Sequence, residues 1–354
     1  MMNTQPNFTP AETALGGVLP HRRMEAWKWT DVRKTLKGGT GLTLVCEPHF
    51  EIPEGVNVSR ETILPKTSVM GAIASRFALE SIVINVPEGF KSTQVLRISN
   101  LEKGHASLCI KLAKGAVLHV EEVHKTSVSG FVNLDMQFDL AQGAKLTRTI
   151  FHHDHAETTR IATAHINAWA DAEITQHTLS FGAALTRFET RVALLGANIK
   201  ADIHGAYLLG DKRHVDMTSY IDFSNESAIV RQSVKGVVSD KARGVFQGKF
   251  HVRRPAQFTD AEMRHDALML SDTCEIRAKP ELEIYADDVA CAHGNTIGAL
   301  DESSLFYMRQ RGIPLGQARS LLTQAFVADA FETMEEGAKE DFLTRISTWL
   351  EARL

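Results

Sequence analysis

A four-residue pattern recurs along the middle of the sequence: Gly or Asp, then Ala, then any residue, then Leu or Ile. Copies begin at Gly115, Gly143, Asp171, Gly182 and Gly196. The first three copies begin 28 residues apart and the last two begin 14 apart. A turn followed by an inward aliphatic residue, repeated at multiples of one unit, is typical of stacked coils. The pattern favours a β-helix, and a β-sandwich with regular hairpins is the alternative.

Short runs of alternating polar and apolar residues surround these copies. Clear examples lie at residues 81–86, 107–112 and 131–136. A period of two is the signature of a strand with one buried face. Long helical periodicity is absent between residues 78 and 300. An all-β region of this size must be a sandwich, a barrel, a propeller or a β-helix.

The two ends of the chain show a different pattern of apolar residues. Residues 21–36 are expected to form a short helix that a glycine-rich stretch at 38–41 ends. From residue 303 onward, apolar residues fall at three- and four-residue spacings, which predicts amphipathic helices, with Gly312 as an interruption and Pro314 in the first turn of the next helix. The sequence therefore predicts an N-terminal mixed or helical region at 1–77, a β-helix core at 78–302 and a C-terminal helical region at 303–354.

Composition narrows the class of protein. The net charge of −4 argues against a dedicated nucleic-acid binder. Four widely spaced cysteines without a C-x-x-C pair argue against a disulfide framework. No secretory pattern starts the chain, and no apolar stretch reaches the roughly 18 residues that a membrane span needs. We therefore expect a cytoplasmic protein whose thiols stay reduced, with no nucleic-acid or membrane partner.

The candidate chemistry centres on Cys291 and His293. Residues two apart point to the same face of a strand. A thiolate beside an imidazole suits iron, zinc or the edge of an iron–sulfur cluster, and the missing ligands would come from elsewhere, including a second chain. A buried cysteine beside a hydrogen-bonded histidine is the alternative that spacing alone favours. A Cys–His nucleophile would need an orienting group, which the sequence does not reveal.

Other chemistry-bearing residues are less specific. The stretch 152–155 reads His-His-Asp-His, which suits either a metal site or a polar turn. Glu281, Glu283 and Asp287 alternate as on a strand and suit either acid–base work or a solvent-facing edge. Cys274 precedes Cys291 by 17 residues, and stacked coils would be needed to bring them together. No P-loop, G-x-S-x-G or H-E-x-x-H motif occurs, which excludes the usual ATPases, α/β-hydrolases and zincins.

Several segments of the second half, in the same order, resemble the SufB/SufD family of iron–sulfur cluster assembly proteins. The similar segments lie at 235–238, 241–249, 259–261, 268–271, 279–289, 291–294, 305–308, 311–313 and 318–326, with a weaker N-terminal tract at 25–30. The Cys-x-His-Gly form at 291–294 resembles SufD rather than SufB, whose equivalent stretch usually reads His-Glu-Ala.

The resemblance implies a right-handed parallel β-helix between helical ends. It implies a non-catalytic scaffold subunit of a SufBCD-type complex, paired with a SufB-like subunit through the β-helix. ATP-driven movement of a bound SufC-like ATPase would reshape the interface where a nascent cluster is built. Cys291 and His293 match interface residues of the family, and His293 is the better candidate ligand for transient iron or a cluster shared with the partner.

The resemblance also implies that the C-terminal helices dock the SufC-like ATPase. The candidate docking residues are Arg311, Gly312, Ile313, Leu321, Leu322 and Phe326. An open β-helix edge invites self-pairing, so a homodimer is expected when the chain is isolated. Two alternatives remain open: a β-helix carbohydrate-active enzyme, and a structural adaptor that binds no metal.

Overall fold

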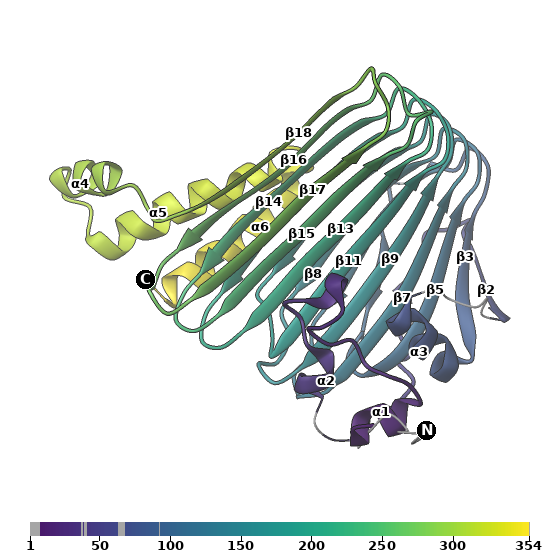
Figure 1. Ribbon diagram of the computed structural model, residues 1–354, viewed down its shortest axis with the longest axis horizontal. Coiled ribbons are helices and arrows are strands. Elements are labelled where there is room, and N and C mark those ends of the chain that lie inside the picture. Colours follow the sequence, from purple (N-terminus) through teal and green to yellow (C-terminus); the bar gives the residue numbers. More distant parts are fainter. Residues whose placement is uncertain (1–7, 37, 39–40, 63–67, 92, 354) are drawn as a thin grey trace, which may run out of the picture.

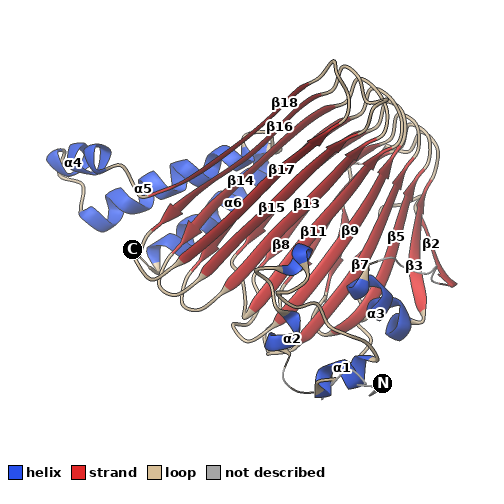
Figure 2. Ribbon diagram, in the orientation of Figure 1, coloured by secondary structure: helices blue, strands red, loops and turns tan. Residues whose placement is uncertain are grey.

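The computed structural model describes residues 8–36, 38, 41–62, 68–91 and 93–353, and two nine-stranded sheets form its body (Figures 1 and 2). The first sheet holds, in order, β1 His49–Glu51, β4 Leu96–Ser99, β6 Val117–His124, β8 Lys145–His152, β10 Glu173–Ser180, β12 Lys200–Leu209, β14 Ile229–Val238, β16 Asp260–Met269 and β18 Ala290–Gly298. The second sheet holds β17 Glu275–Ile284, β15 Arg243–Val252, β13 His214–Phe223, β11 Leu185–Leu194, β9 Thr159–Ala168, β7 Phe131–Leu140, β5 Gly104–Leu112, β3 Glu80–Val86 and β2 Asn57–Thr62.

From β3 onward, the chain passes alternately between the two sheets, and each strand pairs in parallel with the strand one coil away. Glu173, for example, is in register with Lys145 on one side and with Lys200 on the other. Among the strands of the described residues, only β1 and β2, at the N-terminal end, pair antiparallel with their neighbours. This arrangement is a parallel β-helix of about eight turns, which confirms the predicted fold class.

The 28-residue repeat marks one corner of the coil. Gly115, Gly143 and Asp171 all have positive φ angles of 66°, 67° and 61°. Glycine adopts this left-handed conformation without strain, and Asp tolerates it. The backbone N–H of Gly115 donates to Gln142 O at 3.0 Å and that of Gly143 to Ala170 O at 2.9 Å, so each corner is bonded to the next. The alanines that follow the three residues are fully buried.

The last two copies of the pattern do not repeat this corner. Gly182 also has a positive φ, but it lies in the opposite corner, between β10 and β11. Gly196 lies two residues too early, because Asn198, with φ 59°, takes the left-handed position that Asp171 holds one coil before. The 14-residue spacing is therefore not a half-coil, whereas the 28-residue spacing is one full coil.

The N-terminal region covers the outer face of the second sheet with α1 Pro10–Leu15, η1 Glu25–Trp27, α2 Val32–Thr35 and α3 Val69–Ala78 (Figure 1). The prediction of one helix over 21–36 was wrong, because the segment forms a 3-10 turn and a four-residue helix instead. Trp27 and Thr30 are both buried against the sheet: Trp27 packs on the guanidinium of Arg187, and the Thr30 hydroxyl donates to Asp216. The predicted break at 38–41 lies partly outside the described residues.

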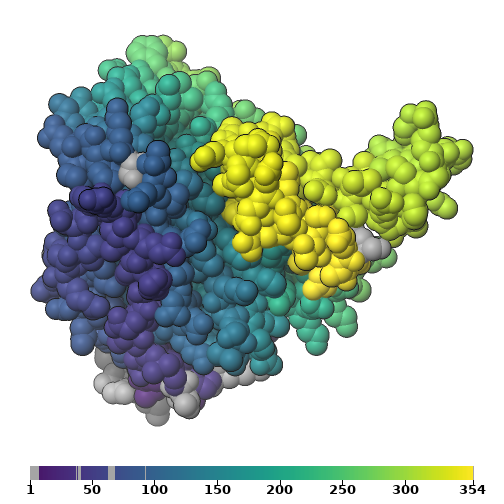
Figure 3. All heavy atoms as spheres, turned by 180° about the vertical axis from the view of Figure 1, so that it is seen from behind, coloured from purple at the N-terminus to yellow at the C-terminus, as the bar shows by residue number. Residues whose placement is uncertain are grey.

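The C-terminal helices are present as predicted: α4 Glu302–Gln310, α5 Leu315–Ala328 and α6 Glu336–Glu351, with the 3-10 turn η2 Asp329–Phe331. Gly312, with φ 83°, separates α4 from α5, and Pro314 immediately precedes the first residue of α5. Phe331, Phe342 and Ile346 pack on apolar residues of the first sheet. In contrast, α4 stands away from the strands as the tip of an arm (Figures 1 and 3).

Candidate functional site at the open end of the β-helix

The C-terminal end of the β-helix is open. In the part of the chain that the structure describes, β17 pairs only with β15 and β18 pairs only with β16, so each is the outermost strand of its sheet. Every residue of β18 except Cys291 is exposed. An outermost strand presents unpaired backbone N–H and C=O groups, which makes it a template for pairing with another chain. Pro280 in β17 fits this position, because proline within sheets is confined largely to edge strands.

Cys291 and His293 lie on this open edge. Their register partners one coil below are Ala261 and Met263, both buried in the core. The two side chains therefore belong to the inward row of β18, on one face, as the spacing predicted. Cys291 is half-buried, and burial, with a smaller contribution from the Asp260 charge, raises the pKa of its thiol. His293 is exposed.

The same inward row contains a hydrogen-bonded clamp. The ring of His265 on β16 lies 2.8 Å from Asn295 Oδ1 through Nδ1 and 2.9 Å from the Tyr207 hydroxyl through Nε2. Since the amide oxygen only accepts, Nδ1 donates and Nε2 accepts. Phe246 stacks on the ring at 4.9 Å. The clamp fixes β18 to β16 at Asn295, two residues after His293. Sequence reasoning missed His265, although strand alternation between Met263 and Ala267 would have placed it inside.

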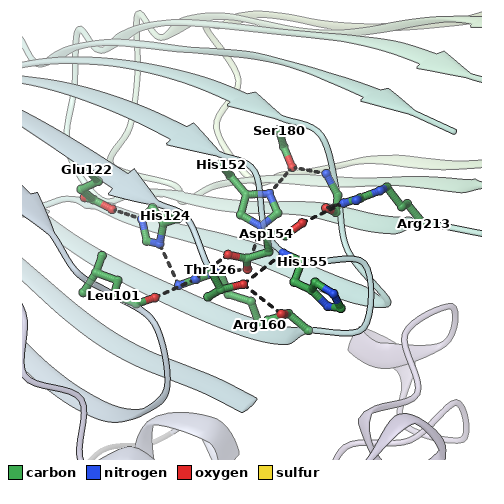
Figure 4. Close-up of polar contacts among 12 residues, drawn as sticks. Leu101, Glu122, His124, Thr126, His152, Asp154, His155, Arg160, Ser180 and Arg213 are labelled. Atoms are coloured by element: carbon green, nitrogen blue, oxygen red, sulfur yellow. Dashed lines mark hydrogen bonds and ion pairs between the residues drawn. The ribbon is translucent and has the colours of Figure 1, made fainter. Parts of the chain in front are cut away.

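The histidine-rich stretch at 152–155 lies in a corner at the end of β8. Figure 4 shows Ser180, His152 and Asp154 in a row: His152 Nδ1 lies 2.7 Å from Ser180 Oγ, and Nε2 lies 3.0 Å from Asp154 Oδ2. This order resembles a hydrolase triad. However, His152 and Ser180 are fully buried and Asp154 is 2% exposed. Because a substrate cannot reach the serine, the arrangement is structural.

The same network extends through a buried arginine. Arg160 donates to both carboxylate oxygens of Asp154, at 2.7 and 2.9 Å, and to Leu101 O at 2.8 Å. It also lies 3.1 Å from His124 Nδ1, whose Nε2 lies 2.8 Å from Glu122 Oε2 (Figure 4). Burial opposes ionisation of Glu122, but Arg148 and His124 lower its pKa to about 2. These interior charges compensate one another and fix the packing of neighbouring coils.

The remaining candidates do not form a site. Glu281 and Glu283, on the outer face of β17, pair with Lys279 at 3.1 Å and with Lys249 at 2.5 Å. Cys274 immediately precedes β17, whereas Cys291 is near the start of β18, so the length of β17 separates them. Within the described ranges, no three His, Cys, Asp or Glu side chains gather as a metal site would require.

The helical arm exposes part of the predicted docking set. Arg311 and Gly312 are exposed between α4 and α5, and Leu321 is 44% exposed. Ile313 and Leu322 are half-buried, and Phe326 packs against the core beneath the arm.

Sequence reasoning did not select the most exposed aromatic residues of the arm, Phe306 and Tyr307, at 65% and 60%. They lie outside the apolar stripe of α4, which faces inward through Leu305. The Arg311 guanidinium stacks on Tyr307 and donates to its hydroxyl at 3.0 Å. Tyr307 and Arg311 thus form one exposed contact, and Phe306 is exposed beside it in the sequence of α4.

Comparison with known proteins agrees with this architecture. The family model described as "SUF system FeS cluster assembly, SufBD core domain" matches residues 96–326, which include β4 to β18 and most of α5. The chain belongs to the SufB/SufD family. The match confirms the resemblance found in the sequence, and it makes the chain an iron–sulfur cluster assembly family protein of the SufD-like kind.

Three curated relatives illustrate the range of the family. The iron–sulfur cluster assembly protein SufD of Escherichia coli (strain K12) is 30% identical over 257 residues, covering 72% of this chain and 61% of the relative. A SufBD family protein of Synechocystis is 30% identical over 202 residues, covering 57% and 45%. A chloroplastic protein of Arabidopsis thaliana is 29% identical over 221 residues, covering 62% and 46%. The chain thus spans about half to three fifths of their lengths.

The helices give no sign of a membrane span. Across the described residues, none is both long enough and apolar enough to cross a bilayer.

Buried neutral histidines should make this SufD-like chain sensitive to mild acid. Burial lowers the pKa of His214 and of His265 to about 4. In the unfolded chain these histidines bind protons near pH 6.5. Their contribution to the free energy of unfolding is therefore complete above that pH and falls as the pH drops toward 4. Each histidine should cost roughly 2 kcal/mol of unfolding free energy at pH 5, measured by urea titration.

The control for this pH dependence is His265→Gln, whose stability should fall less between pH 7.5 and pH 5. Glu122 does not confuse the measurement, because a carboxylate with a pKa near 2 loses its contribution only below about pH 4.5. Equal unfolding free energies of the wild type at pH 7.5 and pH 5 would contradict the assignment of neutral buried rings.

Proposed function

We propose that the chain is a non-catalytic scaffold subunit of a SufBCD-type complex in the cytoplasm, on which an iron–sulfur cluster is built as cargo. A SufB-like subunit pairs with β17 and β18, and a SufC-like ATPase binds the arm formed by α4 and α5. The observation that carries this proposal is the open end, where both sheets finish in an outermost strand and the exposed strand β18 bears Cys291 and His293.

The open end has the composition of a protein interface. Ile284 and Ile297 are 40% and 42% exposed there, and Ile276 and Leu282 are only partly buried against the core. A partner β-helix that adds a strand here would hydrogen-bond the edge backbone groups. The same contact would bury these four apolar side chains. The named family role of the relatives, iron–sulfur cluster assembly, supports a partner of the same family.

The proposal is tested by isolating a tagged chain from its native cytoplasm and assaying iron and acid-labile sulfide. A second β-helix subunit and an ATPase should co-purify, with iron and sulfide on the complex. The scaffold role would be overturned if the chain purified without partner subunits and without metal from a preparation that preserves other complexes. Two observations speak against the carbohydrate-active enzyme. The carboxylates of Glu281 and Glu283 on β17 pair with lysines, and Ser180 is fully buried.

His293→Ala should lower the iron and sulfide content of the isolated complex at least tenfold while the subunits still co-purify. The imidazole of His293 is exposed at the edge and open to iron. Burial raises the pKa of the Cys291 thiol, which must lose its proton before it can bind the metal. The measurement is iron and sulfide per complex after size-exclusion chromatography.

The matched control for His293→Ala is His155→Ala, since His155 is also exposed but lies in a corner beside β8 and β9. It should leave the metal content unchanged. An intact complex with full iron and sulfide in the His293 variant would favour the adaptor that binds no metal.

The isolated chain should form a homodimer through the same open end. Two copies can each pair an exposed strand and cover Ile297 when the SufB-like subunit is absent. Light scattering coupled to size exclusion should give twice the 39.1 kDa chain mass. Ile297→Lys, which places a charge in the apolar row, should give a monomer with unchanged circular dichroism. A monomeric wild type at micromolar concentration would exclude this pairing.

A further inference from the structure

Three histidines lie on the outer face of the first sheet, which the C-terminal helices cover (Figure 3). They are His119 on β6, His177 on β10 and His204 on β12. His177 is in register with His204, and the centroids of the two rings lie 5.6 Å apart. His177 Nε2 also lies 2.9 Å from the hydroxyl of Thr333, between η2 and α6. The histidines therefore belong to the contact between the helices and the sheet.

A groove of about 780 Å³ runs between the start of α6 and the sheet at this contact. Its sheet wall includes His119 and His177, and its helical wall includes Glu335, Asp341 and Arg345. The last two pair with each other at 2.7 Å. The groove is open to solvent, but His177 itself is only 1% exposed. Water therefore reaches the rim of the histidine cluster and not its centre.

The helices contribute to the burial of His177. The ring of Phe331 lies 6.4 Å from the imidazole between centroids, and Thr333 contacts Nε2. Burial, with smaller contributions from His204 and His119, lowers the pKa of His177 to about 3. A side chain on the outer face of a sheet is buried only where another element covers it. The pKa should therefore return toward about 6.5 when the helices leave the sheet.

The carboxylates near His204 do not offset its burial. Burial lowers the pKa of His204, although Asp202 and Asp329 act in the opposite direction. Asp329 is already paired, because its Oδ2 lies 2.6 Å from Lys235 Nζ. Lys235 in turn lies 3.0 Å from Asp266 Oδ2 on β16. His204 is therefore neutral at pH 7 while the helices are docked.

His119 is neutral for the same reason. Burial lowers its pKa, although Glu335 and Glu121 act in the opposite direction. Glu121 is also paired, since its Oε2 lies 2.9 Å from Arg97. His119 Nε2 lies 3.0 Å from the Thr149 hydroxyl, which is a neutral partner. All three rings thus lie in a contact that disfavours their charged form.

The helices can leave the sheet without unfolding the coils. Among the described residues, α5, η2 and α6 follow the last strand and supply no strand to either sheet. The apolar cluster beneath α6 is separate from the cluster that fills the coils. Proteins open locally along boundaries of this kind, at a lower free energy than global unfolding.

We propose that His119, His177 and His204 form an acid-sensitive latch, which holds the C-terminal helices on the β-helix at neutral pH and releases them on acidification before the coils unfold. In the released state each ring binds its proton in water. In the docked state the proton would enter a buried site beside another histidine. The contribution of the latch to docking is therefore complete above about pH 6.5 and is lost as the pH falls below it. This inference goes beyond the scaffold role and concerns this chain alone.

Hydrogen–deuterium exchange on the full-length chain at pH 7.5 and pH 5 tests the latch, after correction for the intrinsic effect of pH on amide exchange. At pH 5 the protonation of His177 alone favours release roughly thirtyfold, since its pKa is about 3 when docked and about 6.5 when released. Protection of the amides in 336–351, which form α6, should therefore fall about tenfold or more. Protection of 185–194, which form β11, should fall less.

Two variants should reduce this loss of protection. His177→Gln should limit the fall in 336–351 to about threefold, because glutamine binds no proton. His204→Gln changes a half-buried position and should also reduce the fall. The matched control is His265→Gln, since burial lowers the pKa of His265 to about 4 but the ring lies inside the coils. It should leave the fall in 336–351 as large as in the wild type. Circular dichroism at pH 7.5 checks that each variant is folded.

Protection in 336–351 that is equal at the two pH values would overturn the latch, and so would a fall of equal size in 336–351 and 185–194. A fall that is as large in His177→Gln and His204→Gln as in His265→Gln would overturn it equally. None of these measurements needs an ATPase, a partner subunit or iron. The latch and the scaffold role can therefore fail independently of each other.

Discussion

Arg160→Ala should lower the free energy of unfolding by about 3–5 kcal/mol, which is a large share of the stability of a typical domain. The side chain is fully buried and makes two hydrogen bonds to Asp154, one to Leu101 O and a contact to His124. Its removal leaves the Asp154 carboxylate buried without its cation. The paired arginine and His152 overcome the effect of burial and lower the pKa of Asp154, so the carboxyl is charged at neutral pH. Urea denaturation at pH 7.5, followed by circular dichroism, measures the loss.

Arg253→Ala is the control for the Arg160 variant, because it also removes two contacts to one carboxylate. Arg253 lies 2.8 and 2.7 Å from the oxygens of Asp222, but its side chain is 51% exposed. Water replaces such a contact at little cost, so this variant should keep a stability close to that of the wild type. Equal losses for the two variants would show that the interior network does not depend on burial for its strength.

The fold was predictable because the geometry of each coil restricts the residue types at fixed positions in the local sequence. The corner of each coil needs one residue with positive φ, followed by a buried small residue, and Gly115, Gly143 and Asp171 show that need in the sequence. Strand alternation placed Cys291 and His293 on one face for the same reason. The repeat became unreadable where Asn198 took the glycine position, since the corner accepts more than one residue type.

The contacts that position the site were not predictable, because they join residues far apart in the sequence. Arg160 meets Asp154 across a corner and Leu101 two coils away, while Lys235 meets Asp329 across 94 positions of chain. Nothing in a local pattern distinguishes such residues from solvent-facing charges. The N-terminal segment was misjudged similarly, because the packing of Trp27 on Arg187 overrides its helical tendency.

The two ends of the β-helix differ in a way that bears on partner choice. At the N-terminal end the outermost strands are β1, with three residues, and the six-residue β2, both antiparallel to their neighbours. Very short edge strands are a common means of avoiding unwanted pairing. The C-terminal end instead finishes in strands of ten and nine residues, both parallel to their neighbours. This difference favours the end that carries His293 for the strand pairing that we propose.

The double variant Phe306→Ala and Tyr307→Ala should weaken binding of the SufC-like ATPase by about 30- to 1000-fold, or roughly 2–4 kcal/mol. Both rings are exposed on α4, which stands away from the strands, and Arg311 stacks on Tyr307. Aromatic and arginine side chains gathered this way are typical of the residues that dominate interface energies. Because the rings do not contribute to the core, the variant should keep the stability of the wild type. Isothermal titration calorimetry with the ATPase of the same cell measures the affinity.

Phe258→Ala is the matched control for the arm, since Phe258 is 61% exposed but lies in a corner of the coil between β15 and β16. Its loss should leave the ATPase affinity within twofold of the wild type. If the arm variant binds as tightly as this control, the aromatic patch of α4 is not the docking surface. If both variants weaken binding alike, the ATPase contacts the coils as well, and the arm is not a separate docking element. Only a selective loss in the arm variant supports α4 as the docking surface for the ATPase.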